Sequence, residues 1–251
     1  MPLETRTLRT PFSSELALPP PFTLVTLREV GDAFAHATAV ATERGAGTLV
    51  YVGRFDLAEF AVVLEPDEPL RQARRSFYAG MVALADALVA HAPPETPLDI
   101  VWPDTLRING GIVGGGRLAW PRGADEDKPP AWLVFGAMIR TVSINTEPGL
   151  TPLSTALEEE GFTDFTAARL LESFARHLML ATDSWQERGF AAVAHDYLAR
   201  LTKENGVRRD IDDNGDLLIR RTGKAEAERQ KLAPAPAKAV WLDPKTGGPR
   251  A

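Results

Sequence analysis

Three consecutive glycines, Gly114, Gly115 and Gly116, stand in the middle of an apolar stretch that predicts a β-strand. Glycine weakens a strand interior, and it occurs there where the strand bulges or where a ligand or another backbone comes very close. A backbone without side chains could lie directly against a bound molecule. The other interpretation is a bulge in a bent sheet that serves no ligand. We expect any site of this chain to be organised by residues 101–118.

Several kinds of catalytic chemistry are excluded by the residue types that are present. The chain contains no cysteine, which excludes disulfides, zinc–thiolate sites, iron–sulfur clusters and thiol nucleophiles. Its four histidines fall on separate predicted helices without the spacing of metal ligands, so we expect no metal site. The sequence also lacks a Gly-x-Ser-x-Gly elbow, a P-loop and a dinucleotide-binding fingerprint.

The composition is that of an ordinary globular protein. The chain has 251 residues, of which 44% are hydrophobic and 25% charged, so it can bury a sizeable core. A net charge of −6 argues against general nucleic-acid binding, and we expect the basic cluster at 71–75 to be a solvated face. No stretch approaches the roughly 18 apolar residues of a membrane span, and the N-terminus does not resemble a secretory signal. We therefore expect a cytoplasmic protein without nucleic-acid or membrane partners.

Strands and helices on both sides of the glycines would have to position them. Asn109-Gly110 is the strongest hairpin signal in the chain and predicts a turn between strands at 106–108 and 112–120. Short β-branched or aromatic runs predict further strands, and apolar residues at three- and four-residue steps predict helices. The further predicted strands are 49–52, 60–64, 98–102 and 132–144, and the predicted helices are 27–44, 70–90, 168–179 and 190–201.

Strands interrupted by helices without strict β-α-β alternation predict an α+β fold, with a mixed, largely antiparallel sheet flanked by helices. The expected main domain is residues 1–205, which begin with an irregular lead-in at 1–21. We expect residues 206–251 to form a small C-terminal β region with a hairpin at 207–221. The stretch at 222–240 is rich in Pro, Ala and charge, and it predicts a linker or a poorly ordered tail.

Trp102-Pro103, the hairpin that follows and Gly115 in its returning strand resemble the catalytic core of the biotin/lipoate protein ligase family. The family pattern runs Lys-Trp-Pro-Asn-Asp, an apolar strand, a turn, and then Lys-x-x-Gly leading into the next strand. Further along, Gly136 matches the first glycine of the family's Gly-x-Gly-Ile-Asn. The resemblance covers residues 25–221, including a closing pair of helices and a shortened form of the small β-domain that often follows.

The resemblance implies where a substrate would bind. Residues 43–47 are similar, loosely, to the Gly-Arg-Gly-rich loop that the family places against the adenylate. The substrate-binding residues that it implies are Arg44, Gly45, Gly47, Trp102, Pro103, Asp104, Gly114, Gly115, Gly116 and Gly136.

The chain departs from the family at the charged positions. The family's lysine after the hairpin turn, which places a cation beside the carboxylate and the α-phosphate, is Ile112 here. The lysine before Trp-Pro is Val101, and the Asn-Asp pair is Asp104-Thr105. The late asparagine is Arg140.

Arg117 and Arg140 are the catalytic candidates, because either could supply the missing cation. Side chains alternate along a strand, so Arg117 points away from the face of Ile112 unless the glycines insert a bulge that resets the alternation. Arg44 and Arg107 are further candidates. Each of these residues could equally be an ordinary surface arginine.

The resemblance leaves two functions open. The first is an ATP-dependent ligase that activates biotin, lipoate or another acyl group as an acyl-adenylate, using ATP with Mg²⁺, and transfers it to a lysine of an acceptor protein. The alternative is a non-catalytic descendant that binds a small carboxylate, a nucleotide or a partner protein in the same cleft. Apolar residues at the charged positions favour the alternative, since apolar walls bind ligands but do not stabilise charge.

Overall fold

A seven-stranded sheet forms the centre of the computed structural model, which describes residues 16–143, 153–163, 165–233 and 239–250. The strand order is β1-β2-β3-β7-β6-β5-β4, in which β1 and β2 pair in parallel and the other neighbours pair antiparallel. The predicted α+β fold with a mixed, largely antiparallel sheet is confirmed. The strands are β1 (Thr23–Leu27), β2 (Thr48–Gly53), β3 (Leu57–Leu64), β4 (Leu98–Val101), β5 (Thr105–Ile108), β6 (Gly111–Ala119) and β7 (Leu133–Arg140).

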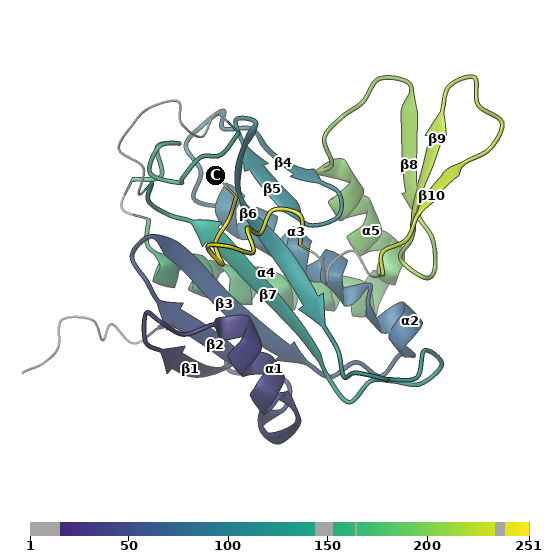
Figure 1. Cartoon of the computed structure of the whole chain (residues 1–251). Coiled ribbons are helices and arrows are strands. Elements are labelled where there is room, and N and C mark those ends of the chain that lie inside the picture. Colours follow the sequence, from purple (N-terminus) through teal and green to yellow (C-terminus); the bar gives the residue numbers. More distant parts are fainter. Residues whose placement is uncertain (1–15, 144–152, 164, 234–238, 251) are drawn as a thin grey trace, which may run out of the picture.

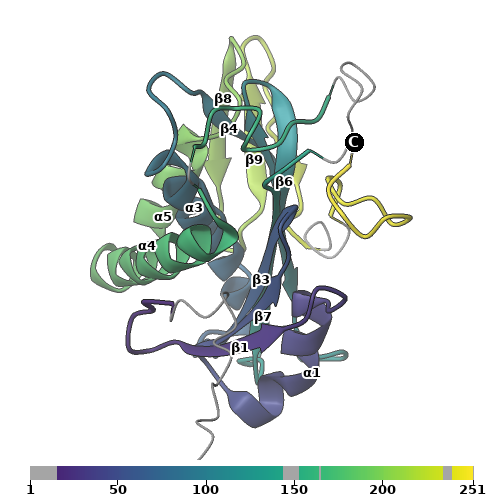
Figure 2. The same cartoon turned by 90° about the vertical axis from the view of Figure 1, so that its left-hand side faces the viewer.

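Helices cover the two faces of this sheet unequally (Figure 1, Figure 2). One face, here called the core face, carries α3, α4 and α5, whereas the opposite face, called the outer face, carries α1. The predicted closing pair of helices is α4 and α5, which meet at Gly189. The helices are α1 (Ala33–Arg44), α2 (Leu70–Ala73), α3 (Ser76–Val89), α4 (Ala167–Arg188) and α5 (Phe190–Ala199).

The middle strands are buried on both faces, which explains their nearly continuous apolar sequences. Along β3, Phe60 packs into the core under α3 and α4, while its neighbour Ala61 packs against α1. The rings of Phe135 on β7 and Phe174 on α4 stack with their centroids 5.7 Å apart. Helix α3 is apolar almost all round because it lies between the sheet and the α4–α5 pair. Burying each such phenylalanine stabilises the fold by about 1.5–3 kcal/mol.

The first helix begins later than its apolar pattern predicts. Strand β1 ends at Leu27, and α1 starts at Ala33 after the N-cap Asp32, whose carboxylate accepts the backbone N–H of Ala35 at 2.8 Å. Val30, which the pattern placed on the buried face of a helix, is almost fully exposed. The prediction of one helix from residue 27 was wrong because Leu27 ends a strand that pairs with β2, and the helix begins only after the N-cap Asp32.

The predicted helix at 70–90 is divided into α2 and α3, and the basic cluster lies at the division. Arg75 is only 8% exposed, so the expected solvated face was wrong for this residue. Its guanidinium pairs with Glu68 at 2.8 Å and lies over the ring of Phe190, with 4.7 Å between the guanidinium carbon and the ring centroid. Arg75 therefore joins the start of α3 to the α4–α5 pair.

A second, three-stranded antiparallel sheet follows α5, with the order β10-β9-β8. The predicted hairpin is confirmed as β8 (Val207–Ile211) and β9 (Leu217–Arg221), while β10 (Glu228–Gln230) adds a strand within the stretch that was expected to be a linker. Among the helices that the structure describes, none is long and apolar enough to cross a membrane.

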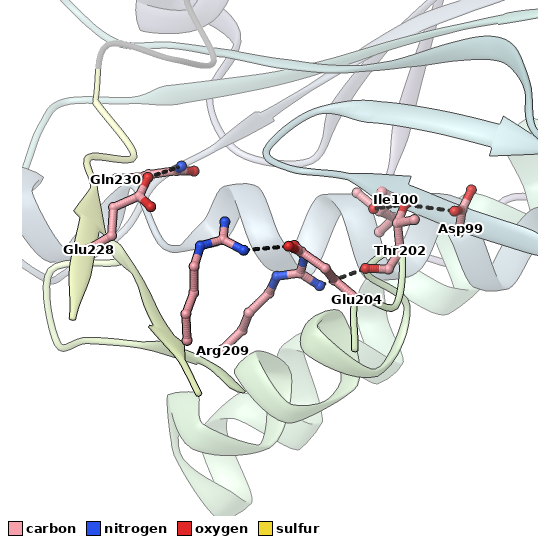
Figure 3. Close-up of polar contacts among 8 residues, drawn as sticks. Asp99, Ile100, Thr202, Glu204, Arg209, Glu228 and Gln230 are labelled. Atoms are coloured by element: carbon pink, nitrogen blue, oxygen red, sulfur yellow. Dashed lines mark hydrogen bonds and ion pairs between the residues drawn. The ribbon is translucent and has the colours of Figure 1, made fainter. Parts of the chain in front are cut away.

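Polar contacts join the small sheet to the edge of the large one (Figure 3). The carboxylate of Glu204 accepts hydrogen bonds from Arg209 on β8, at 3.1 Å, and from Arg221 on β9. Arg209 also donates to the carbonyl of Thr202 at 2.6 Å, and the hydroxyl of Thr202 donates to Asp99 on β4 at 2.7 Å. The small sheet is thereby tied to strand β4.

Candidate functional site

The glycine-rich strand β6 lies next to β7 on one side and β5 on the other. Gly115 is paired with Met138 on β7 and with Thr105 on β5, and Met138 is paired in turn with Glu59 on β3. Paired residues of neighbouring strands lie on the same face of a sheet. Met138 belongs to the apolar cluster on the outer face, so this row of residues lies on that face.

The triple glycine does contain a β-bulge. Leu106 pairs with Gly114 and Arg107 pairs with Ile112, so Val113 has no partner on β5. Gly114 has φ +150°, and a side chain there would collide with the carbonyl oxygen of Met138. The extra residue resets the alternation of side chains along β6.

The bulge brings Arg117 to the same face as Ile112. Val113 and Leu118 belong to the core cluster, whereas Ile112 packs on the outer face. Counting alternately from Leu118, Arg117 lies on the outer face and Gly116 on the core face. The bulge that Arg117 needed in order to share a face with Ile112 is therefore present.

The three glycines have three different surroundings. A methyl group on Gly116 would come within 2.6 Å of the sulfur of Met81, because this glycine packs against α3. Gly114 makes the bulge. Gly115 alone of the three faces outward, and the ring of Trp241 lies over it.

Trp241 belongs to residues 239–250, here called the C-terminal segment, which runs along the outer face on the same side as α1 (Figure 2). Its side chain is fully buried among Leu57, Met138 and the half-buried Ile112. Its indole Nε1–H donates to the carbonyl oxygen of Gly116 at 3.1 Å. Gly115 and the backbone of Gly116, here called the glycine floor, are thus covered by a side chain of the same protein.

Asp104 anchors the same segment. The side chain is fully buried, and its Oδ2 accepts the backbone N–H of Val240 at 3.2 Å while its Oδ1 accepts the hydroxyl of Thr105 at 2.9 Å. Burial raises the pKa of this carboxyl to about 6, because the two hydrogen bonds only partly offset the loss of hydration. A buried carboxylate without a cationic partner needs hydrogen-bond donors, because burying its charge without them is costly.

Trp102 and Pro103 point to the other side of the sheet. The indole of Trp102 packs against the core cluster and donates to the hydroxyl of Tyr78 on α3 at 3.4 Å. The carbonyl of Pro103 accepts the hydroxyl of Tyr197 on α5 at 2.6 Å. These two residues hold the β4–β5 connection against the helices, away from the outer face.

Two arginines flank Ile112 on the outer face. Arg107 is its partner on β5, and Arg140 ends β7 one residue after Ile139, the partner of Gly114. Arg140 donates to the backbone carbonyl of Pro249 in the C-terminal segment at 2.5 Å, and its pKa is lowered by burial.

Neither arginine of this pair forms a direct ion pair with a described residue, although the carboxylates of Glu159 and Asp56 lie near enough to Arg140 to oppose the lowering of its pKa. The Nε of Arg107 is buried without a hydrogen-bond partner. The ion pairs found among the described residues include neither Arg107 nor Arg140. A half-buried guanidinium that is not held in a direct ion pair is suited to bind an anionic ligand.

Arg117, in contrast, is engaged with the start of α1. Its guanidinium carbon lies 4.1 Å from the ring centroid of Phe34, and its Nη2 lies 3.3 Å from the carboxylate of Asp32. Burial lowers the pKa of Arg117, and the nearby carboxylates of Asp32 and Glu59 act in the opposite direction. Gly136 lies under the same ring of Phe34, so α1 covers it.

The loop at 43–47 lies apart from these residues. Arg44 ends α1, Gly45 with φ +75° caps it, and Gly47 precedes β2. Strand β2 then runs to Gly53, so its far end, rather than the loop, lies near Leu57 and Arg140. The structure does not bring Arg44, Gly45 and Gly47 together with Gly115.

A different Gly-Arg pair does lie at that end, and the sequence reasoning missed it. Gly53 closes β2, and Arg54 in the following turn forms a two-pronged hydrogen-bonded pair with Asp56, at 2.9 and 3.1 Å. The backbone carbonyl of Asp56 accepts the N–H of Thr141, next to Arg140. A Gly-Arg pair directly after a buried apolar strand was the signal that could have found it.

The sequence profile of the biotin/lipoate A/B protein ligase family matches residues 18–199, which is most of the chain. The chain belongs to this family. The predicted resemblance is confirmed, and the matched residues include all seven strands of the large sheet and its helices.

Individual relatives agree with this assignment. A biotin--[acetyl-CoA-carboxylase] ligase of Paracoccus denitrificans is 27% identical over 185 residues, which are 63% of this chain and 72% of the relative. A biotin protein ligase-like protein of unknown function from a Silicibacter species has a crystal structure that superposes with a TM-score of 0.75. It is 30% identical, and the superposition covers 86% of this chain and 97% of that one.

The biotin protein ligase of Aquifex aeolicus shares the fold at lower identity. Its structure superposes with a TM-score of 0.65 at 15% identity, covering 83% of this chain and 95% of the ligase. A further structure of that ligase holds biotin and ATP, and superposes with a TM-score of 0.60 at 14% identity, with 83% and 99% coverage.

The structure shows what surrounds the two positions at which the resemblance implies a family lysine. Ile112, which the resemblance aligns with the family's lysine, packs in the cluster formed with Trp241. Val101 ends β4. Besides Arg117, which is paired with Asp32, the same face carries Arg107 and Arg140 from the strands on either side.

Proposed function

We propose that this chain binds a small acyl carboxylate on the outer face and activates it with ATP as an acyl-adenylate, for transfer to a protein lysine. The observation that carries the proposal is the position of Arg140, which lies with Arg107 on the face of Ile112 and forms no direct ion pair with a described residue. Family membership supplies the reaction class.

The reaction needs a cation where negative charge gathers on the carboxylate and the α-phosphate. A guanidinium can meet this need, because its planar array of N–H groups binds carboxylate or phosphate oxygens in pairs. Arg140 already holds backbone carbonyl oxygens of Pro249 and Arg250, at 2.5 and 3.4 Å. The charged oxygens of an acyl-adenylate would be stronger acceptors for the same N–H groups.

ATP would bring its magnesium ion with it. Among the described residues there is no group of three or more histidine, aspartate or glutamate side chains placed to hold a metal ion. Mg²⁺ is usually held through substrate phosphates and one or two carboxylates, so this donor set fits a metal that arrives with the nucleotide. The carboxylates that act on Arg140 are those of Glu159 and Asp56, and Asp104 lies beside Gly115 and Gly116.

A second function, binding without catalysis, is favoured by one observation. Ile112 is enclosed by Trp241, Leu57 and Met138, so the position that carries the family's catalytic charge is part of an apolar cluster. An apolar site of this kind could hold a ligand for sensing or delivery without activating it.

Exchange of radioactive pyrophosphate into ATP, with biotin, lipoate or octanoate present, tests the two functions. The ligase predicts exchange with one of these acids, and a loss of about 100- to 1000-fold on Arg140→Ala, the size seen when a single charge-stabilising donor is removed. Arg208→Ala, at an exposed arginine of the small sheet, is the control and should leave exchange unchanged. Silence with every acid, together with ligand-induced thermal stabilisation, would support binding without catalysis. Silence in both assays contradicts both functions.

A further inference from the structure

Two buried acceptors on the outer face point at the C-terminal segment. The first is Oδ2 of Asp104, which accepts the backbone N–H of Val240 at 3.2 Å. The second is the carbonyl oxygen of Gly116, which accepts the indole N–H of Trp241 at 3.1 Å. Between them lies Gly115, whose missing side chain leaves the room that the indole fills.

The segment closes on itself beyond Trp241. Leu242 and Pro249 form an antiparallel bridge, and the turn between them is held by the backbone bonds from Asp243 N–H to the carbonyl of Gly248, at 2.9 Å, and from Gly247 N–H back to Asp243, at 2.8 Å. Because these bonds lie within the segment, it can leave the sheet as a unit without breaking them. Its attachment to the sheet runs mainly through Val240, Trp241 and the carbonyl of Pro249.

The carbonyl of Pro249 sits where the arginine pair offers its N–H groups. Arg140 donates to this oxygen at 2.5 Å. The segment thus presents an aromatic ring to the glycine floor and an acceptor to the cation, two features that a ring-bearing carboxylate or phosphate also offers. This places the segment across the same residues to which the proposed function assigns the ligand.

A molecule that replaces the segment must satisfy the acceptors that it exposes. A buried acceptor left without a donor is costly, and more so when it is a carboxylate such as that of Asp104. A ring that carries N–H groups can replace the bonds of Trp241 and Val240. A purely aliphatic or dithiolane ligand cannot, because it has no donor at that end.

We propose that the C-terminal segment occupies the ligand site, so that segment and ligand exclude each other. The space that the indole of Trp241 fills, here called the ligand seat, takes a planar ring with an N–H donor. The inference rests on the proposed function for the existence of a ligand. The ureido ring of biotin and the amino-substituted ring of adenine share this chemistry. Lipoate and octanoate lack it.

Hydrogen exchange of the full-length protein measures whether the segment leaves. Amide exchange at 239–250 is followed alone and with biotin, ATP, lipoate or octanoate added separately. We expect faster exchange at Val240 and Trp241 with biotin or with ATP, and no change with the other two probes. Faster exchange with biotin alone or with ATP alone assigns the seat to the ureido ring or to the adenine.

Binding affinity of tryptophan variants gives the second measurement. Trp241→Ala removes the competing ring. It should tighten the binding of biotin or of ATP, whichever accelerates exchange in the segment, by about tenfold if the segment is docked in nine of ten molecules. Trp241→Phe, which keeps a ring but loses the N–H, should fall between this variant and the wild type. Trp132→Phe is the matched control, since it also loses an indole N–H, the one donated to Thr42 at 3.1 Å beside α1.

The outcomes separate this inference from the proposed function. Pyrophosphate exchange with unchanged protection of 239–250 would leave the ligase standing and overturn the displacement of the segment. Equal affinity in wild type and Trp241→Ala would do the same. Tight binding of octanoate or lipoate would overturn the requirement for an N–H donor. If no probe binds any variant, the proposed function itself fails, and the ligand seat fails with it.

Discussion

The indole of Trp241 lies so close to Gly115 that a methyl group added to this glycine would come within 2.5 Å of the ring. The two residues are far apart in the sequence, and the hydrogen bond from the indole N–H to the carbonyl of Gly116 holds the ring in place. Glycine is therefore needed at position 115 for a close approach, as the interior glycines of β6 suggested, but the approaching group is part of the chain.

Replacing Gly115 by alanine tests this packing. The new methyl group would collide with the backbone carbonyl of Asp104 as well as with the indole, and a backbone atom cannot rotate away. We expect a loss of about 1–3 kcal/mol in the free energy of unfolding, typical of overpacking, measured by urea denaturation. Gly53→Ala is the control, because its nearest contact is 3.9 Å away and its change should stay within about 0.5 kcal/mol. Equal stability of the two variants would show that the site is looser than the structure indicates.

The sequence predicted what depends on local pattern and failed where distant residues decide. Asn109-Gly110 gave the turn between β5 and β6 because its backbone preference is local. Whether the glycines bulge could not be read from β6 alone, because the register is set by pairing with β5 and β7. Strand β1 was missed because its partner β2 lies beyond α1. The burial of Trp241 could not be predicted, since a single tryptophan in a polar tail belongs to no helical or strand-like apolar pattern.

The candidate site shows the same division. The resemblance named Gly115 and Asp104 as binding residues of one continuous motif, and the structure places the backbone of Asp104 against Gly115. The arginines could not be ranked from the sequence, since their usefulness depends on which face they share with Ile112 and on which carboxylates lie nearby. Arg117 reached that face through the bulge and then paired with Asp32 of α1.

The stability of the protein should depend on pH through Asp104. Burial raises the pKa of this carboxyl from 3.8 to about 6, so between these values the folded protein binds the proton more tightly than the unfolded chain does. Stability is therefore lost as the pH rises through this window, and the difference corresponds to roughly 3 kcal/mol. Asp104→Asn removes the titration and keeps an oxygen that can accept the N–H of Val240.

Chemical denaturation at pH 4 and at pH 7 measures the effect. We expect Asp104→Asn to gain about 2–3 kcal/mol relative to the wild type between pH 4 and pH 7. Other groups titrate alike in both proteins and cancel in this comparison. A relative stability that is the same at both pH values would mean that Asp104 is not desolvated in the folded state.

The hydroxyl of Tyr78 holds the small sheet to α3. It donates to the carbonyl of Gly215, in the turn between β8 and β9, at 2.6 Å inside the core. Tyr78→Phe leaves that carbonyl without its donor, which costs about 1–3 kcal/mol. Hydrogen exchange should become faster across β8 and β9 and at the β4–β5 connection, where the indole of Trp102 loses its acceptor, and change little in the rest of the large sheet. Tyr51→Phe is the control, because the Tyr51 hydroxyl makes no hydrogen bond with a described residue, and an equal effect of both variants would contradict this anchoring role.

A lysine at position 112 would decide whether the arginines already do the work of the family's cation. Ile112→Lys places a third positive charge between Arg107 and Arg140, where repulsion lowers its benefit. If Arg140 serves the acyl-adenylate, pyrophosphate exchange should not rise in this variant and should fall if the charges disturb each other. A gain of about 100-fold or more, the size expected when a missing charge-stabilising group is restored, would mean that the arginines had not replaced the lysine. Ile112→Met, which keeps an apolar chain of similar length, separates the effect of charge from that of lost packing against Trp241.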